Sequence, residues 1–164
     1  MKTVARLYNI RIKNIILLAF VCLIVLASCN RGPSAGMVQQ ARIDDSLIRV
    51  YLANNPMIKA VKDPSGIYYQ IKKQGTGAYP TVNSNVTVNY VGKLIEGPQF
   101  DAANGYSSPL SRLVKGWQIG IPHLREGGNI LLIVPSALGY GAAGGGPIPE
   151  NAILVFDIDL VSAK

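Results

Sequence analysis

The sequence predicts an α+β fold, in which an antiparallel sheet wraps over one short helix and a small N-terminal helix precedes the domain. Several segments alternate apolar and polar residues with the period of a strand, and turn signals rich in Gly, Pro and Asn separate them. Only one segment inside the domain has helical spacing. Because an antiparallel sheet needs its apolar face covered, we expect this short helix, which carries Trp117, to cover it.

The amino terminus has the pattern of an export signal. Residues 1–14 carry four basic residues and no acid, and residues 15–27 are uncharged and apolar. This apolar run is shorter than the ~20 residues that span a bilayer comfortably. It ends in Leu26-Ala27-Ser28-Cys29, which resembles the lipobox of bacterial lipoproteins. We therefore expect a lipoprotein signal peptide over residues 1–28 and lipidation of Cys29. The alternatives are an uncleaved anchor and an ordinary buried cysteine.

Charge and composition argue against several other functions. Removal of residues 1–28 would leave 12 basic and nine acidic residues, a formal charge of +3 rather than the +7 of the whole chain. The basic residues are dispersed, without a basic and aromatic patch, so no nucleic-acid partner is expected. His123 is the only histidine and no cysteine or carboxylate cluster accompanies it, so neither a metal nor another cofactor is expected.

Two segments are expected between the signal and the domain. Residues 29–40 are small and polar, which predicts a flexible tether. Residues 41–64 are predicted to form a helical extension, in which apolar residues recur at helical spacing before a turn at Asn54-Asn55-Pro56. The apolar residues of this stripe are Ile43, Leu47, Val50 and Tyr51. We expect the helix to pack on the domain, and a dimerising helix is the alternative.

The domain is predicted to occupy residues 65–164. Its expected strands are 67–71, 86–91, 130–134 and 153–161, and its expected helix lies within 112–124, beginning near Leu113. In the second strand, Val86, Val88 and Tyr90 should share one face. In the last strand the inward residues should be Leu154, Phe156, Ile158 and Leu160, whereas Asp157 and Asp159 should face outward.

An ordered set of motifs resembles the FKBP family of peptidyl-prolyl cis-trans isomerases. The motifs are Val88-Asn89-Tyr90-Val91-Gly92, Phe100-Asp101, Val114-Lys115-Gly116-Trp117, Glu126-Gly127-Gly128, Tyr140-Gly141 and the run from Ile148 to Asp157. Each motif alone is weak, but their order and spacing are specific. The resemblance implies an FKBP-like sheet over residues 65–164 and an enzyme that isomerises X–Pro bonds. The lipoprotein signal and preceding helix are also similar to those of bacterial envelope FKBPs.

The resemblance also implies roles for individual residues. Trp117 would be the floor beneath a prolyl ring, and Tyr90, Phe100 and Phe156 would be walls. Leu113 and Val114 would form the rim, with the Val114 N–H and the Tyr140 hydroxyl donating to substrate carbonyls. Asp101 would lie at the pocket edge and Ile148 in an overhanging loop. Taken singly, these aromatic residues would more often be core.

Such a pocket suits the reaction, because rotation about an X–Pro amide has a barrier of ~18–20 kcal/mol and needs no covalent bond to the enzyme. The twisted amide has less charge separation than the planar one. A dry apolar pocket therefore favours the twisted form, and a shape that fits it adds differential binding.

The sequence departs from the family pattern between Asp101 and Leu113, which is shorter than expected. Tyr106 is the first candidate for the missing aromatic wall and Leu110 the second. The Gly144-Gly145-Gly146 loop lacks the bulkier side chain of some relatives. These departures affect the expected rate and the expected affinity for macrolides of the rapamycin type.

The main expectation is an isomerase that acts on proline-containing polypeptides in the cell envelope, anchored by lipid on Cys29 to a bacterial membrane, periplasmic or outer-membrane associated. The first alternative is a chaperone or proline-peptide binding module with little or no turnover. The second is a structural lipoprotein in which the domain is a spacer.

Overall fold

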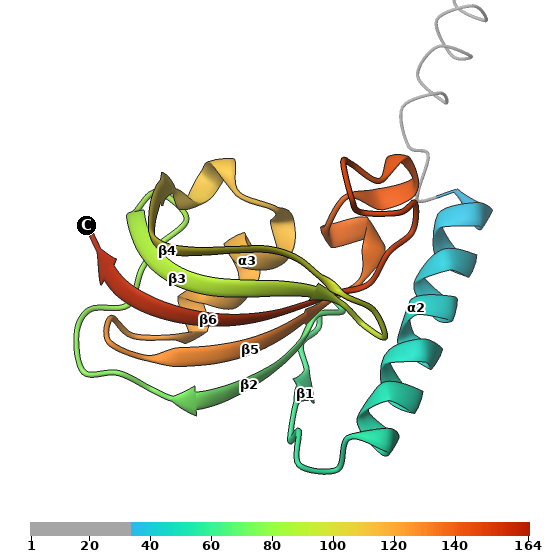
Figure 1. Ribbon diagram of the computed structural model, residues 1–164, viewed down its shortest axis with the longest axis horizontal. Coiled ribbons are helices and arrows are strands. Elements are labelled where there is room, and N and C mark those ends of the chain that lie inside the picture. The colour runs from blue at the N-terminus through green and yellow to red at the C-terminus, as the bar shows by residue number, and fades with distance from the viewer. Residues whose placement is uncertain (1–33) are drawn as a thin grey trace, which may run out of the picture. The chain divides into compact units, whose positions relative to one another are not determined.

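The computed structural model describes residues 34–164, so the predicted signal peptide and Cys29 lie outside the described residues. In the described part, six strands form one antiparallel sheet in the order β1-β2-β5-β6-β3-β4 (Figure 1). The strands are β1 (Val61–Lys62), β2 (Tyr68–Lys73), β3 (Asn85–Leu94), β4 (Gln99–Pro109), β5 (Asn129–Val134) and β6 (Leu154–Ala163). The predicted α+β fold with an antiparallel sheet is confirmed.

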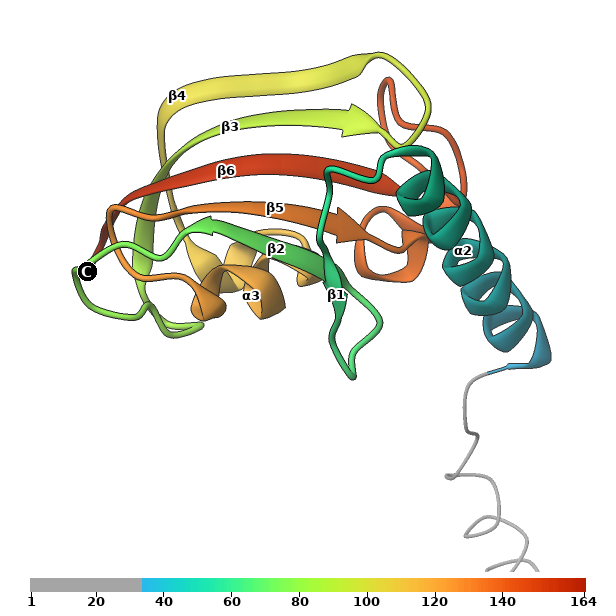
Figure 2. The ribbon, with the colours of Figure 1, turned by 90° about the horizontal axis from the view of Figure 1, so that it is seen from below.

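The inner face of the sheet packs against the short helix α3 (Lys115–Gly120), as Figure 2 shows from below. Val86 and Val88 of β3 are buried in the core between them, as their alternation predicts. The inward residues predicted for the last strand are buried in the same core: Leu154, Phe156, Ile158 and Leu160. Trp117 of α3 packs against them, so the expected cover of the apolar face is present.

Helix α3 is shorter than the sequence predicts. It ends at Gly120, and a 3-10 turn over Ile121–His123 follows, where a helix was expected to run on to about residue 124. The physical reason is Pro122, which has no N–H to donate to a carbonyl one turn earlier. The one α-helix among residues 65–164 therefore carries Trp117 on a segment of only six residues.

The outer face of the sheet is covered near one end by helix α2 (Ala35–Asn54). Ile48 and Tyr51 of α2 form a second core with Leu131 and Ile133 of β5. The other members of this core are Tyr68 of β2, Val155 of β6 and Ile153, which directly precedes β6. This second core explains why β5 is apolar on both faces. Within residues 34–164, no helix combines the length and apolar character needed to cross a membrane.

Two predictions about α2 are wrong. The helix begins at Ala35 rather than Ala41, so residues 35–40 of the predicted tether are helical. Three of the four residues of the predicted stripe also do not pack on the domain, because Ile43, Leu47 and Val50 are 42%, 50% and 51% exposed, whereas the fourth, Tyr51, is buried. The helix is rotated so that Asp44, Ile48 and Tyr51 face the domain. Apolar periodicity cannot predict this face, because it does not account for an acid that is buried against hydrogen-bond donors of the domain.

Strand β4 continues well past Asp101, into the segment before Leu113 that we predicted to be a shortened connection. It pairs with β3 from Gln99 to Pro109. The register shifts between the Val88–Tyr106 and Tyr90–Ala103 pairs, and Gly105 adopts a φ of +68° there. The Gly105 N–H donates to Asn89 Oδ1 over 2.8 Å. A bulge of this kind twists an edge strand and re-aims the side chains beside it.

Candidate active site

A pocket of about 130 Å³ opens between α3 and one end of the sheet. Its lining comes from β3, β4, β6, the start of α3 and the loop after β5. Nine predicted site residues line it: Tyr90, Phe100, Asp101, Tyr106, Leu113, Val114, Trp117, Tyr140 and Phe156. These residues are up to 66 positions apart in the chain, and antiparallel pairing of β3 with both β4 and β6 brings most of them together.

The pocket is built from rings in edge-to-face contact around Trp117. Phe156 lies 5.2 Å from Trp117 between ring centroids at an interplanar angle of 87°, and Tyr90 lies 5.0 Å away at 81°. Phe100 meets Phe156 in the same way at 5.7 Å, and Tyr106 meets Tyr90 at 6.0 Å. Because each contact is close to perpendicular, the rings present their faces and edges at fixed angles and form a rigid apolar wall.

Gly92 allows two of these rings to meet. A Cβ at this position would lie 2.8 Å from both the Phe100 Cζ and the Phe156 Cε1 atoms. Gly92 pairs with Asp101 on β4 and with Phe156 on β6, so it lies directly beneath both walls. The Val88–Gly92 motif thus ends in a glycine for a steric reason, and a side chain here would push the walls apart.

Polar chemistry at the pocket edge is concentrated in Tyr90 and Asp101. The Tyr90 hydroxyl donates to Asp101 Oδ2 over 2.6 Å. Burial raises the pKa of the Tyr90 phenol well above its ordinary value, and the hydrogen bond to the Asp101 carboxylate raises this pKa further. Tyr90 is therefore a neutral donor throughout the physiological range, and it holds the carboxylate at the rim.

The rim residues are held by the side chain of Gln118. Its Nε2 donates to the backbone oxygen of Leu113 over 2.6 Å and to that of Ser111 over 3.1 Å. Val114 is the residue before α3, with a φ of −57° and a ψ of 147°, and its carbonyl accepts from the Trp117 N–H. The extended backbone at Leu113 and Val114 therefore passes the pocket mouth in a fixed conformation.

Two tyrosines flank the opening and reach into solvent. Tyr140 is 43% exposed and Tyr106 is 42% exposed. The Tyr140 ring lies against the backbone of Gly145, where a Cβ would be 3.1 Å from Tyr140 Cδ1. The glycine-rich loop therefore contacts the Tyr140 ring from outside. A bulkier side chain at Gly145 would crowd this ring.

Two predicted site residues do not line this pocket. Leu110 is fully buried in the inner core, so its side chain does not form the wall that was considered for it. It lies directly after β4, where the chain turns under the sheet towards α3. Ile148 is also buried in the inner core. Its backbone N–H and carbonyl bridge to Gly145, so it ties the glycine-rich loop to the core.

Trp117 carries an unsatisfied donor. Its indole Nε1 is buried and has no hydrogen-bond partner among the described residues. Leaving such a group unpaired costs about 1–3 kcal/mol. The ring is held between Tyr90 and Phe156 by the edge-to-face contacts described above.

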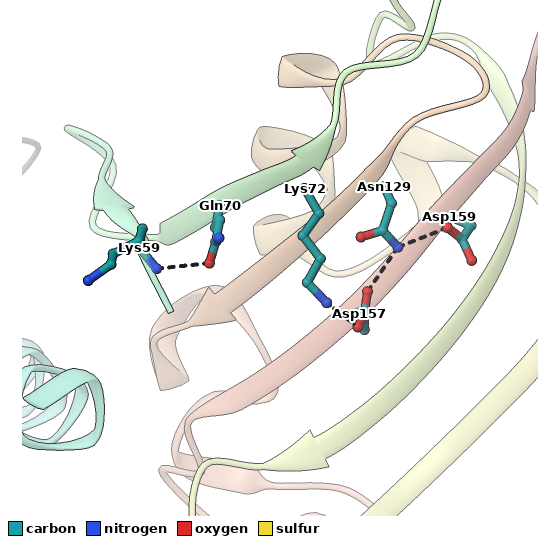
Figure 3. Close-up of polar contacts among 6 residues, drawn as sticks. All are labelled: Lys59, Gln70, Lys72, Asn129, Asp157 and Asp159. Carbon is teal, nitrogen blue, oxygen red and sulfur yellow. Dashed lines mark hydrogen bonds and ion pairs between the residues drawn. The ribbon is translucent and has the colours of Figure 1, made fainter. Parts of the chain in front are cut away.

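A larger hollow of about 800 Å³ lies on the outer face of the sheet, and charged and amide side chains stand among its lining residues. Figure 3 shows Lys72 reaching Asp157 across this face, and Asn129 lying between Asp157 and Asp159. The Lys59 N–H donates to Gln70 Oε1 beside them (Figure 3). An ion pair and bridging amides bind water, so this hollow does not provide the dry surroundings that a twisted amide needs.

An antiparallel sheet, one short helix and an aromatic pocket between them define this domain as an α+β fold with a small apolar site at the pocket. Residues 77–161 match the family model of the FKBP-type peptidyl-prolyl cis-trans isomerases. The chain belongs to this family.

Named relatives and a solved structure agree with this assignment. The chain is 39% identical over 119 residues to the FKBP-type peptidyl-prolyl cis-trans isomerase FkpA of Aeromonas hydrophila, covering 70% of this chain and 44% of the relative. It is 40% identical over 143 residues to FkpA of Escherichia coli strain K12, covering 84% of this chain and 53% of the relative. The crystal structure of FkpA from Escherichia coli superposes with a TM-score of 0.68 and 31% identity, covering 92% of this chain and 71% of that one. The chain spans about half the length of the curated relatives it matches.

Proposed function

We propose that this protein is a peptidyl-prolyl cis-trans isomerase that acts on proline-containing polypeptides. The observation that carries the proposal is the ring of aromatic contacts around Trp117, closed at the edge by the Tyr90–Asp101 hydrogen bond. The pocket has room for one small ring. Membership of the family supports the same activity.

The proposed mechanism requires no covalent intermediate. The prolyl ring enters over Trp117, between Tyr90, Phe100 and Phe156, and leaves its water behind. The amide loses part of its charge separation as it twists, so an apolar pocket stabilises the twisted state relative to the planar one. The Val114 N–H and the Tyr140 hydroxyl donate to the flanking carbonyls and hold the peptide while the bond rotates.

The test is the isomerisation rate of a short X–Pro peptide with the full chain kept soluble in mild detergent. We expect a rate above the uncatalysed one and a large loss in Trp117→Ala, because that change removes the pocket floor. A rate equal to the uncatalysed one would reject the enzyme and leave the binding module. Titration of Trp117 fluorescence with the same peptide separates that module from a spacer, which would bind no peptide.

A specific observation favours the binding module as the second candidate. Tyr106 and Tyr140 leave one side of the pocket open to solvent, since both are more than 40% exposed. Water that reaches the amide weakens the preference for the twisted form while leaving apolar contacts with the prolyl ring in place. A protein with this pocket would bind proline peptides measurably and turn them over slowly.

We further propose that the protein works in the cell envelope, tethered to a bacterial membrane through lipid on Cys29. The basic residues, the apolar run and the Leu26-Ala27-Ser28-Cys29 motif support this location. Macrolides of the rapamycin type are proposed as ligands of the same pocket, because their ring would compete for the surface above Trp117. Competition between such a macrolide and the X–Pro peptide tests this directly.

A further inference from the structure

Asp44 of α2 is a buried acid that binds the domain rather than solvent. Its side chain is 1% exposed. Asp44 Oδ2 accepts the Ser136 N–H over 2.8 Å and the Ser136 hydroxyl over 2.7 Å. Asp44 Oδ1 accepts from Gln40 Nε2 over 2.8 Å. All the partners are donors, which is the arrangement that a carboxylate requires when it is withdrawn from water.

Ser136 lies four residues before the pocket residue Tyr140. It is itself 1% exposed, and it begins a 3-10 turn over Ser136–Leu138. Its backbone carbonyl accepts from the Gly139 N–H over 3.0 Å, which closes that turn immediately before Tyr140. Asp44 thus accepts the N–H of the first residue of the turn, and Tyr140 follows the turn after Gly139. Ser136 is thus joined to the residue before Tyr140 by the hydrogen bond that closes the turn.

Other contacts of the Tyr140 region come from residues later in the chain. The Asn151 N–H donates to the Gly141 carbonyl over 2.8 Å, and the Gly145 backbone supports the ring. The Tyr140 side chain itself is largely exposed. The Asp44–Ser136 hydrogen bonds are therefore the buried polar attachment of the segment that delivers Tyr140.

We propose that Asp44 is a positioning residue for the pocket: through Ser136 it fixes the Tyr140 hydroxyl where it donates to a substrate carbonyl. The expected loss of isomerase activity rests on the proposed function, whereas the expected displacement of Tyr140 does not. Asp44 thereby gives α2 a role in substrate recognition beyond covering the outer face of the sheet. Loss of the carboxylate frees the start of the turn, and Tyr140 then samples positions outside donor distance.

The kinetic test uses the full chain and compares Asp44→Ala with Asp45→Ala as the matched control. Asp45 is the next residue of α2, but it binds Lys62 and Tyr68 on β1 and β2 and does not touch Ser136. We expect Asp44→Ala to lower kcat/KM for an X–Pro peptide by roughly tenfold to a hundredfold, since misplacing a positioning group by about 1 Å can cost on the order of a hundredfold. Asp45→Ala should leave kcat/KM within about twofold of the wild type, because exposed ion pairs contribute little. Equal losses in the two variants would overturn the proposal.

A double-mutant cycle asks whether Asp44 acts through Tyr140. If it does, Asp44→Ala adds no further loss once Tyr140→Phe has removed the hydroxyl. Losses that multiply would show that Asp44 acts elsewhere, and the proposal would fail. Ser136→Ala keeps the backbone N–H bond and removes only the hydroxyl bond. It should give a smaller loss than Asp44→Ala, and it keeps the test decisive if Asp44→Ala does not fold.

A structural readout is independent of catalysis. In the full chain labelled with 3-fluorotyrosine, the ¹⁹F signal of Tyr140 is identified by its absence in Tyr140→Phe. We expect this signal to shift or broaden in Asp44→Ala and Ser136→Ala and to stay unchanged in Asp45→Ala. An unchanged signal in both test variants would overturn the proposal even if the protein is an active isomerase. A shifted signal in a protein without isomerase activity would reject the proposed function and keep the positioning role.

Discussion

At the scale of single residues, Tyr90 joins the apolar and polar parts of the pocket. Its ring packs edge-on against Trp117, and its hydroxyl donates to Asp101. The phenol is therefore held neutral in two ways, by burial and by a carboxylate that accepts its proton in a hydrogen bond. The hydrogen bond also satisfies the Asp101 carboxylate, the one acid among the residues that line the pocket.

Tyr90→Phe should lower the free energy of unfolding by about 1.5 kcal/mol at pH 7, the low end of the range for a hydrogen bond to a charged acceptor, because the pair is partly exposed. The raised pKa of Tyr90 makes its contribution complete below about pH 10, the ordinary tyrosine value, and progressively lost above it. The stability difference between wild type and variant should therefore shrink as the pH rises past about 10.

Urea unfolding at pH 7 and at about pH 10.5 measures both quantities. Tyr106→Phe is the control, because Tyr106 lies on the same pocket but is 42% exposed. A Tyr90→Phe deficit that grows with pH would contradict the assigned direction of the pKa shift.

The residues around the pocket were predictable because an ordered set of motifs places them by resemblance, and nine of them meet at one pocket. Leu110 was not predictable in this way. Its candidacy rested on the apparent shortness of the segment after Asp101, and that segment is a strand whose end carries Leu110 into the core. Asp44 and Ser136 were missed for another reason: their hydrogen bonds join residues 92 positions apart, and no local pattern records such a pair.

At the scale of secondary-structure elements, α3 lies unusually close to β5 because of its two glycines. A Cβ on Gly120 would be 2.5 Å from Leu132 Cδ2, and one on Gly116 would be 2.5 Å from Val134 Cγ1. The helix that carries Trp117 is therefore set at its height above the sheet by backbone contact with these side chains. Changing that height moves the pocket floor.

Gly120→Ala should destabilise the protein by about 1–3 kcal/mol, the usual cost of forcing extra volume into a packed core. Gly36→Ala is the control, because Gly36 is an exposed glycine of α2 and alanine is the better helix former. Thermal unfolding of both variants measures the difference. A Gly120→Ala variant as stable as the wild type would show that α3 is free to move away from β5.

Helix α2 is attached to the β1–β2 end of the sheet by Asp45. Its carboxylate accepts hydrogen bonds from Lys62 Nζ and from the Tyr68 hydroxyl, and it pairs with Arg49 Nε over 2.9 Å. The hydrogen bond from Lys62, followed by that from Tyr68, lowers the pKa of Asp45 below its ordinary value. Asp44 and Asp45 thus bind two different parts of the domain from adjacent positions on the helix.

Asp45→Asn should lower the free energy of unfolding by about 1 kcal/mol at pH 7, since the carboxylate is partly exposed and its ion pairs are screened. Because the pKa of Asp45 is lowered by folding, its contribution is present above about pH 4 and lost as the pH falls below that. Denaturant unfolding at pH 7 and at about pH 3 should show the variant's deficit shrinking in acid. A deficit of equal size at both pH values would argue against a charged contact.

The existence of α2 followed from the sequence, but its buried face did not. Periodicity selected Ile43, Leu47 and Val50 together with Tyr51, and only Tyr51 lies on the buried face, which also holds Asp44 and Ile48. A rule that counts apolar residues assigns an acid to the exposed face of a helix, and Asp44 is buried. Strand β4 was missed in a similar way, because its residues are small and polar at an exposed sheet edge and lack the alternation of a half-buried strand.

At the scale of the whole molecule, the sheet separates two cores with different tasks. The inner core holds α3 and the aromatic pocket, and the outer core holds α2. Strand β5 contributes to both, with Leu132 on the inner side and Leu131 and Ile133 on the outer. Helix α2 therefore packs on the opposite side of β5 from the inner core.

The proposed anchor makes a prediction for the whole protein in cells. Cys29→Ser should release the protein from membranes or leave an unprocessed precursor, because serine lacks the thiol that would take the diacylglyceryl group. Cys22→Ser is the matched control, since Cys22 lies inside the apolar run and not at its end. Metabolic labelling with a radioactive fatty acid, followed by membrane fractionation, distinguishes the two cysteines. The wild type and Cys22→Ser should carry label and sediment with membranes, whereas Cys29→Ser should carry no label, whether it is released or remains as an unprocessed precursor. Label that persists in Cys29→Ser would remove the lipid anchor from the proposal while leaving the pocket and its chemistry unaffected, because the domain builds both from residues 34–164 alone.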